Sequence, residues 1–341
     1  MNSRAGLACV LTTIQQPTAS VRRLAQAVGR EGATLIVIGD RKGPASYECP
    51  ATEFLPIAQQ QSLGFEITPL LPENHYVRKN LGYLKAMQSG AQCIYETDDD
   101  NMPLPSWAPR ELVASLEPIE ARSWANIYRL FSPDDLIWPR GFPLNLVSDE
   151  TTFSHASVGS LLAIEAPIQQ GLADGSPDVD AAWRLLLDRE YSFPERPGFW
   201  LPPNTWCPFN SQSTWWWPVA YPLMYLPVNC TFRMTDIWRS LVAQRCLWAL
   251  GCGMAFHGSE VLQERNIHNL MRDFKDEVPG YLQNERIAGI LSETELEPGD
   301  EAVSRNMRTC YSALVEAAIM PKAELPPVDA WLADVGRAKG V

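Results

Sequence analysis

The stretch RKNLGYLKAMQSGAQCIYETDDDN (78–101) places a helix, a strand and a run of acids in direct succession. Apolar residues recur at helical spacing over 80–91, and Gly90 is a stop signal for that helix. The residues QCIYETDDD (92–100) predict a buried strand that ends in three aspartates. A helix that leads into a buried strand is typical of a parallel sheet covered by helices.

The same alternation of strands and helices precedes this stretch. Two buried strands are predicted by the apolar runs GLACVLTTI (6–14) and ATLIVIGD (33–40), and the spacing of residues 19–29 predicts a helix between them. We also expect a short helix over 50–63 and a third strand over 65–71. These elements predict a Rossmann-like α/β fold, with a mixed, mainly parallel sheet flanked by helices.

The regular alternation fades after residue 130, where proline and tryptophan become frequent. Further helices are predicted over residues 177–190, 235–250 and 259–292. We therefore expect one α/β domain in two halves and a tail. These parts are a ligand-binding first half (1–130), a proline- and tryptophan-rich second half (131–290) and a C-terminal extension (291–341).

Composition excludes several classes of protein. The 341 residues are 46% hydrophobic and 20% charged, so the chain can bury a large core and is not disordered. A formal net charge of −12 argues against general binding to nucleic acid or to an anionic membrane. No apolar run approaches the roughly 20 residues of a membrane span. The eight cysteines include no CxxC pair, which argues against zinc and disulfide frameworks and favours a cytoplasmic location.

Polar side chains follow each predicted strand at its end. Thr12 and Thr13 end the first strand, Asp40 ends the second, and the aspartates 98–100 end the last. Because ligands of open α/β sheets bind at the carboxyl ends of the strands, we expect these residues to line one site. Asp40 can accept hydrogen bonds from a ribose or a base; capping of the turn RKGP that follows it is the alternative.

Asp98, Asp99 and Asp100 are the sharpest chemical feature of the sequence. Three adjacent carboxylates repel one another and stay ionised at low cost only beside a cation or strong donors. Hard oxygen ligands favour Mg²⁺ or Mn²⁺, and these ions commonly take substrate phosphates as further ligands. We therefore predict a Mn²⁺ or Mg²⁺ site at Asp98 and Asp100, with a solvated acidic loop as the alternative.

A basic segment precedes the aspartates. Arg78, Lys79 and Asn80 lie at the predicted start of the helix. A helix N-terminus favours anions, and two cations there strengthen the preference. We predict that these residues bind a diphosphate; an ordinary exposed basic pair is the alternative.

Residues 78–101 resemble nucleotide-sugar-dependent glycosyltransferases of the GT-A fold, in which a basic helix start precedes a strand with an Asp-x-Asp metal motif. More closely, the chain resembles the STELLO family of glycosyltransferase-like proteins. The blocks that carry this resemblance keep one order along the chain. They are IGDRKGP (38–44), IWPRGFPL (137–144), QGLADGSPDVDAAWRL (170–185), FNSQST (209–214) and RMTDIWRSLVAQR (233–245).

The resemblance implies a GT-A-like fold whose first half binds a nucleotide sugar and whose second half completes the acceptor side. It also places Arg140, in the block WPRGFPL, near the diphosphate or the sugar, with a rigid packing loop as the alternative. The residues implied to bind the metal and donor are Asp40, Arg78, Lys79, Asn80 and Asp98–Asp100.

An inverting glycosyltransferase needs a carboxylate that takes the proton of the acceptor hydroxyl. The candidates are Asp236, at the start of TDIWRSLVAQR, and Asp178 and Asp180 in PDVD; helix capping is the alternative role for all three. His257 and His268 are candidate further metal ligands, with a structural role as the leading alternative.

Seven of the twelve tryptophans lie between residues 200 and 248. Because sugars stack on indole rings, Trp215–Trp217 are predicted to form part of an acceptor cleft. Packing in the core or at a subunit contact is an equal alternative, and contact with a membrane interface is a third.

These features predict a metal-dependent glycosyltransferase. It would move a sugar from a nucleoside diphosphate, with UDP as the first candidate, to a hydroxyl of a glycan or another acceptor. A sugar-nucleotide mutase, which needs no acceptor cleft, and a non-catalytic scaffold that binds sugar nucleotides are the alternatives. Nucleic acid is not an expected partner, and the sequence is compatible with a homo-oligomer.

Overall fold

The computed structural model describes residues 6–120, 123–133, 135–153, 160–264 and 269–338. Within them, eleven strands form one sheet in the order β3-β2-β1-β4-β12-β9-β13-β10-β6-β8, with β5 paired to β13. A small second sheet joins β7 (Ser123–Trp124) and β11 (Thr205–Trp206). The strands of the large sheet are β1 (Leu7–Thr13), β2 (Thr34–Gly39), β3 (Thr52–Leu55), β4 (Cys93–Thr97), β5 (Asn101–Pro103), β6 (Val113–Pro118), β8 (Leu162–Glu165), β9 (Ile168–Gly175), β10 (Gly198–Leu201), β12 (Ser213–Trp216) and β13 (Met254–Gln263).

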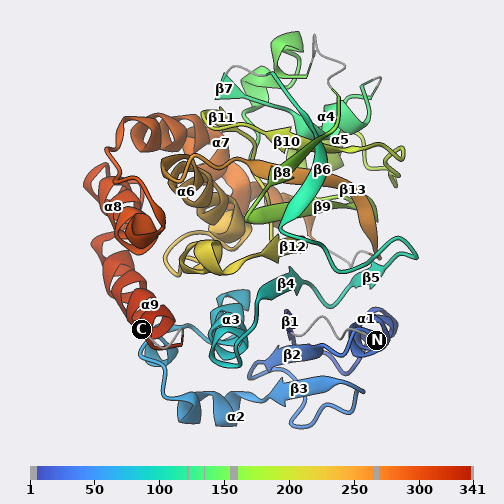
Figure 1. Ribbon diagram of the computed structural model, residues 1–341, viewed down its shortest axis with the longest axis vertical. Coiled ribbons are helices and arrows are strands. Elements are labelled where there is room, and N and C mark those ends of the chain that lie inside the picture. Colours follow the sequence, from blue (N-terminus) through green and yellow to red (C-terminus); the bar gives the residue numbers. More distant parts are fainter. Residues whose placement is uncertain (1–5, 121–122, 134, 154–159, 265–268, 339–341) are drawn as a thin grey trace.

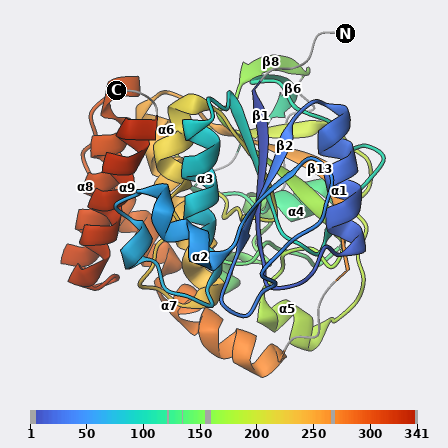
Figure 2. The ribbon, with the colours of Figure 1, turned by 90° about the horizontal axis from the view of Figure 1, so that it is seen from below.

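The first half of the sheet is built as the sequence predicts. β1 pairs in parallel with both β2 and β4, and β2 pairs in parallel with β3. The apolar strands are buried between α1 (Ala19–Arg30) on one face and α3 (Lys79–Gln88) on the other (Figure 2). The predicted α/β fold is confirmed, and the parallel strands all end at the same edge of the sheet.

The predicted helix over 50–63 is wrong in its first half. Residues Thr52–Leu55 form the edge strand β3, and the helical part is limited to α2 (Ile57–Gln60) and a 3₁₀ turn over Gln61–Leu63. β3 pairs with Leu35–Ile38 of β2, which completes the hydrogen bonding of that buried strand. This long-range pairing has no signature in the periodicity of residues 50–63.

The predicted strand over 65–71 is also wrong. Its backbone N–H groups at Glu66 and Ile67 donate to the carboxylate of Asp334, each at 2.9 Å. Pro69 has no N–H to offer to a strand ladder, and the segment closes into a 3₁₀ turn instead. A contact with the far end of the chain therefore replaces strand pairing.

β12 joins the two halves of the molecule, because it pairs antiparallel with β4 on one side and with β9 on the other (Figure 1). The predicted helix over 235–250 is confirmed as α6 (Thr235–Ala249). The helix predicted over 259–292 begins only at α7 (Leu270–Glu293), since β13 pairs with β9 as far as Gln263. None of the described helices has the length and apolar character needed to cross a bilayer.

The described residues after 291, as far as residue 338, form a layer of the fold rather than an extension. α8 (Val303–Glu316) packs on α6, and α9 (Leu325–Ala338) packs on α3 (Figures 1 and 2). Trp331 is completely buried, and its indole N–H donates to the carbonyl of Pro222 at 2.8 Å. The C-terminal helices therefore cover the same face of the sheet as α3.

Replacing Trp331 with alanine is expected to lower the free energy of unfolding by about 3–5 kcal/mol, because a buried aromatic side chain is lost and a cavity remains. Urea denaturation followed by circular dichroism measures the change. Leu282→Ala is the control: Leu282 is 71% exposed, so its loss should stay within about 0.5 kcal/mol. Equal effects for the two variants would contradict the packed position of α9.

Candidate active site

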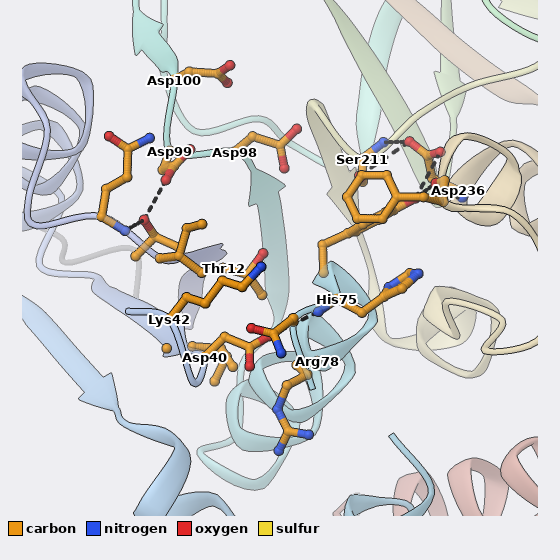
Figure 3. A pocket seen from close by; sticks show the side chains of 18 of the residues that line it. Thr12, Asp40, Lys42, His75, Arg78, Asp98, Asp99, Asp100, Ser211 and Asp236 are labelled. Atoms are coloured by element: carbon orange, nitrogen blue, oxygen red, sulfur yellow. Dashed lines mark hydrogen bonds between the residues drawn. The ribbon is translucent and has the colours of Figure 1, made fainter. Parts of the chain in front are cut away.

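A cavity of about 520 Å³ opens at the carboxyl ends of β1, β2 and β4 (Figure 3). Its volume lies within the roughly 300–1,000 Å³ range of small-molecule sites. Residues from the second half, on the loop before β12 and at the start of α6, form the facing wall. The predicted site residues that line the cavity are Thr12, Thr13, Asp40, Arg78, Asp98, Asp99, Asp100, Arg140 and Asp236.

Other predicted site residues lie away from the cavity lining. One more, His268, lies outside the residues that the structure describes. The predicted residues that do not line the cavity are Lys79, Asn80, Asp178, Asp180 and His257.

Two of the aspartates are fixed by neighbours on α3 and β1. One carboxylate oxygen of Asp98 accepts a hydrogen bond from Lys79 Nζ at 2.7 Å, and one oxygen of Asp99 accepts a hydrogen bond from the Thr13 hydroxyl. The other oxygen of Asp98 forms no hydrogen bond with a described residue, so it is available as a ligand.

Burial raises the pKa of all three carboxyl groups. It is the main cause for Asp98 and Asp99, where Lys79 and Thr13 respectively oppose it. Burial, together with the charges of Asp98 and Asp99, raises the pKa of Asp100 to about 7. A bound cation would offset this cost of ionising adjacent acids.

The aspartates fit a Mn²⁺ or Mg²⁺ ion whose coordination is completed by a substrate. Such ions suit hard carboxylate oxygens, and Mg²⁺ usually binds through one or two carboxylates together with phosphates and waters. Within the described ranges, no three His, Cys, Asp or Glu side chains are grouped so as to hold an ion. A cation bound here would therefore depend on oxygens supplied by a ligand.

Asp40 lines the cavity at the end of β2 and connects two loops. Its carboxylate accepts hydrogen bonds from the backbone N–H of Arg41 at 2.6 Å and of His75 at 3.0 Å. The first bond is the turn cap considered as the alternative role of this residue. The second bond fixes the loop before α3 against the end of β2.

Lys79 and Asn80 do not reach the cavity, contrary to the prediction. Both are fully buried: Lys79 Nζ donates to the carbonyl of Thr97 at 2.9 Å as well as to Asp98, and Asn80 exchanges two hydrogen bonds with the backbone of Leu226, at 2.9 and 3.0 Å. The first turn of α3 is enclosed by the sheet and the second half, so these polar side chains serve internal contacts.

Arg78 lines the cavity, but its guanidinium group is occupied. Nε donates to the side chain of Gln60 at 2.7 Å, and Nη1 donates to the carbonyl of Leu71 at 3.1 Å. Burial lowers its pKa, although the charge of Asp40 opposes this effect. In Figure 3 the guanidinium group points away from the three aspartates. Arg78 thus braces a loop of the cavity wall.

Arg140 is the centre of a buried charge cluster. Its guanidinium group donates to both carboxylate oxygens of Asp178, each at 2.8 Å, and to those of Asp236 at 3.0 and 2.9 Å. Burial acts to lower the pKa of Arg140, but these two carboxylates outweigh it and hold the pKa above its ordinary value. Because its donors are used in this way, Arg140 stabilises the cavity wall. This role fits the alternative in which the loop around Arg140 is a rigid packing loop.

Asp236 lies in the cavity wall, but its carboxylate oxygens already accept hydrogen bonds from other residues of the protein. Besides the bonds from Arg140, they accept hydrogen bonds from the Ser211 N–H at 3.1 Å and the Tyr76 hydroxyl at 3.3 Å. Burial acts to raise the pKa of Asp236, but the charge of Arg140 outweighs it and brings the pKa well below its ordinary value. Such a carboxylate is a weak proton acceptor, so its role as catalytic base stays a prediction that this geometry disfavours.

The other two candidate bases lie behind this wall. Asp178 belongs to the cluster around Arg140. Asp180 caps α5 (Ala181–Leu186), where it accepts from the Trp183 N–H at 2.8 Å, which confirms its alternative role in capping. Burial raises the pKa of Asp180 to about 7.

His257 lies on β13, away from the aspartates. Its Nε2 is 2.9 Å from the side-chain oxygen of Gln169, and burial holds its pKa well below the ordinary value of histidine. The prediction that it contributes to the aspartate site is therefore wrong. A neutral imidazole held by a buried amide fits the structural alternative.

The tryptophan run is part of the core. Trp215 and Trp216 are completely buried, and Trp217 is 8% exposed. The indole N–H groups of Trp215 and Trp216 donate to Glu260 at 2.7 Å and to Glu96 at 2.9 Å, respectively. The predicted acceptor cleft at Trp215–Trp217 is wrong, and the core alternative is confirmed.

The wall of the cavity also contains residues that no motif of the sequence singles out. Lys42 follows Asp40 in the turn RKGP, and His75 and Tyr76 precede Arg78. Phe232, which is 49% exposed, contacts the rings of His75 and Tyr76 with centroids 4.9 and 4.7 Å apart. Burial lowers the pKa of His75 to about 4, so this ring is neutral at pH 7. Proximity to Asp40 and Arg78 in the sequence was the available signal for the first three.

Solved structures with similar chain paths include two mycobacterial proteins. The crystal structure of M. tuberculosis glucosyl-3-phosphoglycerate synthase matches with 10% sequence identity and a TM-score of 0.37, over 82% of this chain and 80% of that chain. A second structure, described only as a mycobacterial protein, also has 10% identity and a TM-score of 0.37, over 93% of this chain and 76% of that chain.

Sequence comparison gives a more specific result. Residues 233–338 match the family model of the STELLO glycosyltransferases. Two Arabidopsis thaliana proteins, described as probable glycosyltransferases STELLO1 and STELLO2, are 29% and 30% identical in alignments of 265 residues that cover 71% of this chain. The match covers 33% and 34% of these relatives, so the chain spans about a third of their length. Over most of its length, the chain is therefore similar in sequence to STELLO proteins.

Proposed function

We propose that the chain is a metal-dependent glycosyltransferase that takes its sugar from a nucleoside diphosphate, with UDP as the first candidate, and transfers it to a hydroxyl acceptor. The observation that carries this proposal is the cavity at the strand ends, with Asp98, Asp99 and Asp100 in its wall. The similarity to STELLO glycosyltransferases supports the reaction class.

In this proposal, Asp98 and Asp100 hold Mn²⁺ or Mg²⁺. When bound, the ion would offset the negative charge on the departing diphosphate. The chain's own residues prepare the site: Lys79 orients Asp98, and Thr13 orients Asp99. Because these partners lie on α3 and β1, the carboxylates are held by the rigid part of the sheet.

The facing wall comes from the second half and is proposed to meet the sugar and the acceptor. Arg140 holds Asp236 in this wall, while Phe232 presents an exposed ring beside it. An exposed aromatic face suits the apolar face of a sugar. In this proposal the donor lies between two walls, which the pairing of β4 with β12 brings together.

A thermal-shift screen of nucleoside diphosphates and their sugars, with and without Mn²⁺, tests the proposal. Binding at 100 times Kd should stabilise the chain by about 2.7 kcal/mol through mass action, and the shift should need the metal. Transfer or slow hydrolysis of the donor should accompany binding. Absence of binding to every nucleotide would contradict the proposal, as would a ring isomer as the only product or binding without any turnover.

A further inference from the structure

Among the described residues, four cationic side chains line the cavity, and three of them form hydrogen bonds or ion pairs within the protein. Arg78 and Arg140 are held by the contacts given above, and Arg233 pairs with Glu277 at 2.8 Å. Lys42 forms no hydrogen bond or ion pair with any residue in the described ranges. It is therefore the cation of this wall that has its charge free for a ligand.

The turn that carries Lys42 is fixed on both sides. The N–H of Gly43 donates to the carbonyl of Asp40 at 2.8 Å, and the Asp40 carboxylate binds the backbone of His75. A Cβ at position 43 would lie 3.1 Å from the Asp40 carbonyl oxygen and 3.3 Å from that of Thr13, so the turn is packed closely against the end of β1. Its backbone is thus rigid, and only the lysine side chain has freedom to adjust.

The two neighbouring cations of this turn point to different places. Arg41 pairs with Glu73 outside the cavity, and its side chain is 68% exposed. Figure 3 shows the side chain of Lys42 directed into the cavity, on the side where the aspartates lie. Of the two adjacent positive charges of this turn, Arg41 therefore lies toward solvent and Lys42 toward the cavity.

We propose that Lys42 contacts the diphosphate of the bound nucleotide. This inference rests on the proposed function and moves the diphosphate contact from Arg78 and Lys79 to Lys42. A lysine ammonium group is a compact point charge that suits phosphate oxygens, and it can follow the charge that develops as the diphosphate departs. Lys42 is expected to act together with the cation at the aspartates, each on a different part of the diphosphate.

Calorimetric titration of Lys42→Met with UDP, UMP, uridine and inorganic pyrophosphate, all in the presence of Mg²⁺, tests the inference. Methionine keeps much of the side-chain length and removes the charge. Loss of one charged contact should weaken UDP and pyrophosphate by about 10- to 100-fold. Uridine has no phosphate and should bind as it does to the parent chain.

Arg41→Met is the matched control, because it removes the same charge from the adjacent position but outside the cavity. It should leave the affinity for UDP and pyrophosphate within about twofold, and Lys42→Arg should retain most of the affinity. Equal weakening by Lys42→Met and Arg41→Met would overturn the inference, since general electrostatics would then explain the effect. Unchanged UDP affinity in Lys42→Met would overturn it too.

These outcomes are distinct from failure of the proposed function. If the parent chain binds UDP with Mg²⁺ and Lys42→Met binds it equally well, the inference alone is wrong. If the parent chain binds neither UDP nor pyrophosphate, the inference fails together with the UDP form of the proposed function. If Lys42→Met folds poorly, Lys42→Arg still tests the inference, because arginine keeps the positive charge. Loss of UDP binding by a folded Lys42→Arg variant would contradict a charge contact.

Discussion

Asp100→Asn is expected to remove the Mn²⁺-dependent part of UDP binding and to lower sugar transfer by about 100- to 1,000-fold, the range for loss of one electrostatic stabiliser of a transition state. The substitution preserves the side-chain shape, and its amide oxygen can still accept the bond from Gln263. It removes the negative charge that attracts a cation. Titrations with UDP, with and without Mn²⁺, and a donor-turnover assay measure the two effects.

Asp300→Asn is the control for this experiment, because Asp300 is an exposed acid that does not line the cavity. Asp98→Asn should show the same loss of metal dependence and an added loss of stability. The added loss is expected because the buried ammonium group of Lys79 would no longer have its ion-pair partner. Metal-dependent affinity that persists in both cavity variants would rule out the proposed metal site.

Arg140→Met should lower the free energy of unfolding by about 3–5 kcal/mol at pH 7, because the buried carboxylates of Asp178 and Asp236 lose the guanidinium group that they share. Urea denaturation measures this change. Arg189→Met is the control: Arg189 pairs with Asp135 at the surface, so its loss should stay within about 1 kcal/mol. A similarly small effect for Arg140→Met would show that the cluster does not hold the wall.

The pH dependence of the same variant has a definite sign. In the parent chain the pKa of Asp236 is depressed, so its stabilising contribution is present above the unfolded pKa of about 3.9 and is lost as the pH falls through the folded pKa. Without Arg140, burial should raise that pKa above the unfolded value. The loss of unfolding free energy in Arg140→Met, relative to the parent chain, should therefore be largest near pH 7 and become smaller toward pH 4. A loss that is the same at every pH would contradict the charge argument.

The first half of the fold was predictable because its signals are local. The apolar runs of β1, β2 and β4 and the helical spacing of α1 and α3 each lie within a dozen residues. The errors at β3 and at residues 65–71 have a different origin. β3 depends on pairing with β2, and residues 65–71 are held by the carboxylate of Asp334. Neither partner can be inferred from the period of the segment itself.

The cavity was predictable to the extent that it follows from strand ends. Thr13, Asp40 and Asp98 come together because parallel strands present their carboxyl ends at one edge of a sheet. The predicted contribution of His257 failed because its place on β13 depends on the pairing of that strand with β9. Register between distant strands has no signature in a short motif.

The sequence by itself determined the α/β architecture and the position of the aspartates at a strand end. Only the tertiary structure decided which charges are bound and which are free. Arg78 and Lys42 are both basic residues of the cavity wall, yet Arg78 is held by side-chain and backbone oxygens, whereas Lys42 faces the cavity. Arg140 meets carboxylates 38 and 96 residues away. The energy of a charge depends on its burial and on such distant partners, so it is fixed only when the chain has folded.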